Sequence, residues 1–101
     1  MKHKTSVSND AEIIRELRDD PEFAAEYLNA ALKDTQEPAV LLMALRHLSE
    51  ARGGLARVAK QAGIERESLY RVLSSKGNPR LSTLTAVFKA LGVTIRLELA
   101  S

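Results

Sequence analysis

Apolar residues recur at helical spacing along most of the chain. They return every three or four positions in residues 10–20 ("DAEIIRELRDD") and again after Pro21, which predicts two successive helices. The next segment, residues 39–51 ("AVLLMALRHLSEA"), is apolar around most of a helical circumference. A helix with that pattern is buried on most sides, so we expect it at the centre of the core.

Two short helical patterns follow the Gly53-Gly54 pair. The first has its apolar positions at Leu55, Val58, Ala59 and Ala62. Gly63 is predicted to end it, because glycine adopts the left-handed conformation of a helix end at little cost. The second begins near Glu65 or Arg66, and its inward positions are Leu69, Val72 and Leu73. A further helical pattern runs through residues 84–91 and ends at Gly92.

The last segment changes its period. In residues 93–99 ("VTIRLEL") apolar and polar residues alternate, which is typical of a strand. The chain offers no second strand pattern, and an isolated strand leaves its backbone groups unpaired. We therefore expect the strand to pair with that of a second chain, with a dimer interface made of Val93, Ile95, Leu97 and Leu99.

These patterns predict a mainly α fold of five to six helices with a C-terminal β-strand paired across a dimer. The expected organisation is a flexible N-terminal arm (residues 1–9), an acidic helical segment (10–36), a helix-turn-helix domain (37–92) and a dimerisation strand (93–101).

Two short helices joined by a tight glycine turn indicate a helix-turn-helix, whose second helix lies in the DNA major groove. On a helical wheel anchored by the inward trio, the outward or flanking positions are Arg66, Glu67, Ser68, Tyr70 and Arg71. Arginine binds guanine O6 and N7 bidentately, and glutamate accepts from cytosine N4. Glu67 has an alternative role, since an acidic residue in a first turn also favours the positive end of the helix.

Basic and polar residues surround this pattern. Residues 55–80 hold six Lys/Arg and two Asp/Glu. Such side chains contact phosphates and position a protein on the duplex without specifying sequence. The predicted phosphate contacts are Arg57, Lys60, Ser74, Lys76, Asn78 and Arg80.

Charge is distributed unevenly. Residues 1–51 contain six Lys/Arg and ten Asp/Glu. Residues 52–101 contain nine Lys/Arg and three Asp/Glu. This asymmetry suggests an anionic partner for the second half, although uneven surface charge alone would look the same. No apolar run is long enough to span a membrane, and we expect a soluble, cytoplasmic protein.

The residue types argue against an enzyme. Cysteine is absent, there are two histidines, and the chain has neither a glycine-rich phosphate loop nor a clustered Asp/His pattern. His47 falls on the crowded apolar helix, where a core role is expected. We predict no metal and no cofactor.

From residue 58 onward the chain resembles the Xre/Cro-type helix-turn-helix, and thus a lambda-repressor-like domain. The run "RESLYRVLSSKGNP" (66–79) with "TL" at 83–84 and "ALG" at 90–92 is similar to the HigA-like antitoxins, which are bacterial addiction-module antidotes. "EYLNAAL" and "LMALRHLSEARGGLARVA" extend the resemblance over nearly all of the chain after Asn9. It departs chiefly at Gly54, where related domains often carry a serine or threonine cap.

The resemblance implies two activities. Such proteins bind a palindromic operator as homodimers and repress their own operon, and they neutralise a small RelE/ParE-like toxin. The acidic stretch of residues 10–37, with nine Asp/Glu and three Lys/Arg, is complementary to a basic toxin, although solvated acidic helices would look the same. Two alternatives stay open: a stand-alone Xre-family regulator without a toxin, and a protein-interaction module that no longer binds DNA.

Overall fold

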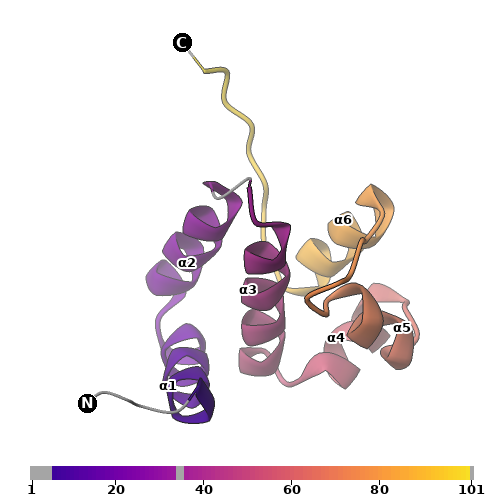
Figure 1. The fold of residues 1–101 in the computed structure, drawn as a ribbon, viewed down its shortest axis with the longest axis horizontal. Helices are drawn as coiled ribbons and strands as arrows, with labels where there is room; N and C mark the ends of the chain where they lie inside the picture. Colours follow the sequence, from indigo (N-terminus) through magenta and orange to yellow (C-terminus); the bar gives the residue numbers. More distant parts are fainter. Residues whose placement is uncertain (1–5, 34–35, 101) are drawn as a thin grey trace.

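Six helices make up the fold. The computed structural model describes residues 6–33 and 36–100 of the chain. Within them the helices are α1 (Ser6–Asp19), α2 (Pro21–Lys33), α3 (Pro38–Ala51), α4 (Leu55–Ala62), α5 (Arg66–Val72) and α6 (Leu81–Ala90) (Figure 1). The predicted mainly α class is confirmed. None of the described helices has the length and apolar character needed to cross a membrane.

Helix α3 is the central element. It packs against α1, α2 and α4, and Figure 1 shows it between the α1–α2 pair and the group formed by α4, α5 and α6. Leu42, Leu45 and Leu48 of this helix are buried. The prediction that residues 39–51 form a central core helix is therefore confirmed. A helix that is contacted on both sides has apolar residues on both sides.

The N-terminal helix is longer than predicted. It begins at Ser6 rather than at Asp10, so residues 6–9 of the expected arm are helical, and residues 1–5 lie outside the described part. No glycine or proline interrupts residues 6–9, so the helix continues to Ser6. Helix α2 begins as its sequence indicates: the Asp20 carboxylate accepts from the N–H groups of Glu22 and Phe23 at 3.1 and 3.2 Å.

The C-terminal tail, residues 93–100, leaves the end of α6. Two bonds close that helix: Gly92 N–H donates to the Lys89 carbonyl and Val93 N–H to the Phe88 carbonyl, as in a Schellman motif. Val93 thereby packs against the chain's own core, although it was predicted in the dimer interface. Beyond it, Leu97 and Leu99 are 96% and 98% exposed, and the tail extends away from the helices (Figure 1). This single chain forms no strand in its described residues, so the strand and its pairing stay predictions.

A chain of hydrogen bonds ties the first three helices together. The Tyr27 hydroxyl of α2 lies 2.7 Å from Nδ1 of His47 in α3, and His47 Nε2 lies 3.3 Å from the Asp10 carboxylate of α1. Because a carboxylate only accepts, Nε2 carries a proton, and in the neutral imidazole Nδ1 then accepts from the Tyr27 hydroxyl. His47 is thus the buried structural residue that its position predicted.

Replacing Tyr27 with phenylalanine is expected to lower the free energy of unfolding by about 0.5–1.5 kcal/mol at neutral pH, because His47 Nδ1 loses its donor. Burial, and secondarily the Asp10 charge, raises the pKa of Tyr27 above its ordinary 10.0. A group whose pKa is raised by folding contributes its full stabilisation at pH values below its pKa in the unfolded chain. This contribution is lost as the pH rises through its pKa in the folded protein. Thermal melts between pH 8 and 11 should show wild type losing its advantage over Tyr27→Phe; a constant difference would contradict this role.

Candidate nucleic-acid interface

The turn between α4 and α5 has the geometry that the sequence predicted. Gly63 has a φ of 72°, in the left-handed region. Its N–H donates to the Lys60 carbonyl at 3.3 Å, and the Ile64 N–H donates to the Ala59 carbonyl at 2.9 Å. These bonds satisfy the last carbonyls of α4 and let α5 start at Arg66, within one residue of the predicted position.

Helix α5 presents one face to the core and another to solvent. Leu69 and Leu73 are both fully buried and belong to the hydrophobic core. The outward ridge, which we define as Glu67, Tyr70 and Arg71, is exposed, and Tyr70 is 54% exposed although it is a large aromatic residue. Tyrosine and arginine are both enriched in interfaces relative to the rest of a protein surface.

The two remaining predicted base contacts lie beside the ridge. Arg66 is exposed at the start of α5, while Ser68 is half-buried. The Arg71 guanidinium donates from Nη2 to Ser68 Oγ at 3.3 Å. This bond places the Arg71 guanidinium beside Ser68, and base contact by Ser68 stays a prediction.

The predicted phosphate contacts are mostly exposed and basic, and they lie in α4 and in the segment after α5; the side chain of Arg57, in α4, lies against Gly53 in the turn before that helix. Ser74 is the exception: it is half-buried, and its hydroxyl donates to the Arg71 carbonyl at 2.8 Å. Since phosphate oxygens only accept, Ser74 would have to exchange this internal bond to contact DNA. The exposed members are Arg57, Lys60, Lys76, Asn78 and Arg80.

Arg46 of α3 forms a hydrogen bond to the C-terminal end of α5, and the sequence analysis did not identify this residue. Its guanidinium donates from Nη1 to the backbone carbonyl of Leu73, at the C-terminal end of α5. The last carbonyls of a helix lack partners within the helix, so a charged donor from α3 stabilises that end. The available signal was an arginine within a mostly apolar helix, which indicates an internal partner.

Gly77 allows the loop after α5 to fold back onto the helix. Its N–H donates to the Ser74 carbonyl at 2.8 Å, and a Cβ at this position would overlap the Val72 carbonyl oxygen. Any other residue therefore forces the loop away from the helix end. The glycine of "KGNP" has a steric role next to the candidate phosphate contacts.

Gly77→Ala is expected to destabilise the protein by about 1–3 kcal/mol, because the obstructing atom belongs to the backbone and cannot rotate away. Thermal unfolding measures this effect. Ser75→Ala, an exposed substitution in the same loop, is the matched control and should change stability by less than about 0.5 kcal/mol. Equal melting curves for Gly77→Ala and wild type would refute the close approach.

Around α5, the described residues form no further cluster of side chains that would indicate another kind of site. Among them, no group of three or more His, Cys, Asp or Glu side chains is placed to hold a metal ion. The surface around α5 is instead an exposed, amphipathic ridge with a positively charged surround.

Comparison with known proteins identifies the family of this chain. Residues 9–99 match a family model described as "Probable addiction module antidote protein". An uncharacterized protein of Haemophilus influenzae is 38% identical over 72 residues, which cover 71% of this chain and 72% of that protein. No solved structure matches the chain. With nearly all of its length matched, the chain belongs to the family of probable addiction module antidote proteins.

Proposed function

We propose that this protein is the antitoxin of a type II toxin–antitoxin module, and that it binds the operator of its own operon through α4 and α5. In this function α5 lies in the major groove and α4 crosses the backbone. The outward ridge contacts base edges, with Arg71 directed to a guanine and Glu67 to a cytosine or to a neighbouring arginine.

The observation that carries the proposal is the two-sided character of α5. Leu69 and Leu73 fix the helix in the core, Arg46 fixes its C-terminal end, and the opposite side is free to meet a duplex. The exposed basic side chains lie on the segments before and after the helix, where phosphate contacts would position it. Membership of an antidote family supports a regulatory role beside a toxin.

Arg71→Ala is expected to weaken binding to the operator by about 1–3 kcal/mol and to relax specificity at one base pair, because a bidentate contact is lost. Lys60→Ala is the matched comparison: it should weaken binding to every sequence alike and reduce the slope of log affinity against log salt by about 0.9. Fluorescence anisotropy with operator and scrambled duplexes measures both.

Each variant has an opposing outcome. A wild-type footprint for Arg71→Ala would remove that residue from base recognition, and a sequence-selective loss in Lys60→Ala would argue against a phosphate contact. If wild type does not bind any duplex at low salt, the chain is a protein-interaction module instead. Both side chains are exposed, so the fold should persist in either variant.

The proposed DNA-binding form is a homodimer. Two copies place their α5 helices in successive major grooves about 34 Å apart and so read a palindrome. The tail provides the contact: Ile95, Leu97 and Leu99 are exposed in the single chain and alternate with polar residues. A strand pair between two copies would satisfy the backbone groups of both tails.

The proposed toxin partner is a small basic RelE/ParE-like protein. Exposed acidic side chains of α1 and α2 offer it a complementary surface; they are Glu12, Glu16, Asp19, Glu22 and Glu26. Co-purification of the neighbouring gene product with this chain tests the pairing. A stand-alone Xre-family regulator would bind DNA equally well and co-purify with no such protein.

A further inference from the structure

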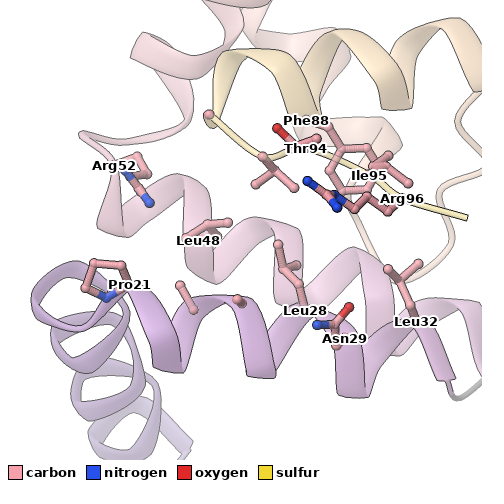
Figure 2. A pocket seen from close by; sticks show the side chains of 14 residues that line it. Pro21, Leu28, Asn29, Leu32, Leu48, Arg52, Phe88, Thr94, Ile95 and Arg96 are labelled. Atoms are coloured by element: carbon pink, nitrogen blue, oxygen red, sulfur yellow. The ribbon is translucent and has the colours of Figure 1, made fainter.

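A pocket of about 310 Å³ opens beside the tail, between α2, the end of α3 and α6. Leu28, Leu32, Leu48 and Phe88 line it, together with tail residues that include Thr94, Ile95 and Arg96. Figure 2 shows Leu28 and Leu32 of α2 pointing toward the tail, which crosses above them. Its lining is mostly apolar, and its volume exceeds that of a leucine side chain.

The charges on the tail select one antiparallel register. In a two-fold pair, each residue lies opposite a residue of the second copy, and opposite residues point to the same face. When Leu97 lies opposite Leu97, Arg96 lies opposite Glu98 in both halves of the pair. On the apolar face the same register sets Ile95 opposite Leu99. This register therefore pairs opposite charges on one face of the strand pair and apolar side chains on the other.

The neighbouring registers fail on charge or on pattern. Centring the pair on Arg96 sets two arginines opposite each other, and centring it on Glu98 sets two glutamates opposite, which is destabilising. Centring it on Ile95 places Glu98 and Leu99 opposite residues 92 and 91 of the second copy. Those residues lie at the end of α6 and not in the tail. A shift by a single residue puts apolar side chains opposite charged ones, since the side-chain period is two.

We propose that a second copy of this chain pairs its tail in the register centred on Leu97 and seats its Leu99 over this pocket, beside Ile95. The inference rests on the proposed homodimer and specifies its geometry. The second copy's Leu99 moves from near-complete exposure into contact with Ile95 and the apolar lining, while its Glu98 pairs with Arg96. Dimerisation thereby fills the pocket and covers the most exposed apolar residues of the chain.

The register is tested with single cysteines, for which the cysteine-free chain is a clean background. Directly opposite residues have Cα atoms about 4.5 or 5.5 Å apart, within disulfide range, whereas diagonal neighbours are about 7–8 Å apart. Leu97→Cys should oxidise to a covalent dimer fastest among the single variants at 95–99. Arg96→Cys and Glu98→Cys should cross-link to each other in a mixture faster than either cross-links to itself.

Charge reversal tests the pairing without a covalent bond. Arg96→Glu sets glutamates opposite each other and Glu98→Arg sets arginines opposite, so each variant alone should self-associate more weakly than wild type. A mixture of the two restores opposite charges at both positions and should form heterodimers in preference to either homodimer. Native mass spectrometry of differently tagged chains measures this preference.

The pocket is tested at Leu32, which lines it and is 44% exposed. Leu32→Asp should weaken dimerisation while the monomer stays folded. Met43→Asp is the matched control, since Met43 is 40% exposed on α3 and does not line the pocket. Analytical ultracentrifugation should show a raised dimer dissociation constant for Leu32→Asp, with Met43→Asp close to wild type.

The outcomes separate the register from the dimer itself. A wild-type chain that sediments as a monomer when bound to operator would remove the proposed homodimer. A wild-type dimer whose fastest cross-link lies elsewhere than at Leu97, or whose charge-reversed variants fail to combine, would overturn the register alone. A dimer equally tolerant of Leu32→Asp and Met43→Asp would remove the pocket from the interface.

Discussion

Leu69→Ala is expected to lower the free energy of unfolding by about 2–5 kcal/mol and to abolish operator binding at moderate temperature. Leu69 is fully buried at the centre of α5, so its truncation removes apolar contacts and leaves a cavity beneath the outward ridge. Domains of this size are stable by about 5–15 kcal/mol, so the loss is a large share of the total. Urea unfolding and a duplex-binding titration measure the two effects.

Tyr70→Ala is the control on the adjacent position. Tyr70 is exposed, so its truncation should change stability by no more than about 0.5 kcal/mol, while its effect on DNA binding is independent of folding. Should Leu69→Ala melt like wild type, the helix is not held by this residue. Should both variants bind operator like wild type, α5 is not the recognition helix.

Ile95→Asp is expected to leave the protein monomeric at concentrations where wild type is dimeric, and to reduce operator affinity by roughly 10²–10⁴-fold. A carboxylate at this position would be buried against the second copy without a partner, which is costly. In the single chain Ile95 is exposed, so the substitution should not unfold the monomer. Light scattering and anisotropy with a full and a half operator separate dimerisation from groove contact.

Thr94→Asp places the same charge one residue away, on the polar side of the predicted strand. It should preserve the dimer, since Thr94 is exposed and alternates with Ile95, so the charge lies on the other face of the strand pair and opposite no apolar anchor. Affinity for a half operator should be the same in both variants. If Ile95→Asp instead remains dimeric at low concentration, the interface lies on another surface of the molecule.

Periodicity predicted the helices well because it reports which face of each segment is buried. The inward residues Leu69 and Leu73, the turn at Gly63 and the central position of α3 all follow from local spacing. The first helix was placed too late, at Asp10, because residues 6–9 are mostly polar and show no apolar period. A mostly polar sequence alone does not distinguish an arm from a turn of helix.

Contacts between distant residues were not predictable in the same way. The bond from Arg46 to the Leu73 carbonyl joins residues 27 positions apart, and no local pattern specifies it. Val93 was assigned to an interface by its alternation with Thr94, yet its backbone closes α6 and its side chain follows onto the core. In both cases tertiary packing determines where the side chain lies. The spacing of apolar residues along the sequence carries no information about that packing.

The central position of α3 has a consequence for how the molecule comes apart. It packs against α1 and α2 on one side and against α4 on the other, so neither half retains a closed core alone. We therefore expect the free energies of the two halves not to be separable, and melting to be cooperative across the described helices. A partner that binds only α1 and α2 would raise the thermal midpoint of α5 as well, by mass action on one shared folding equilibrium.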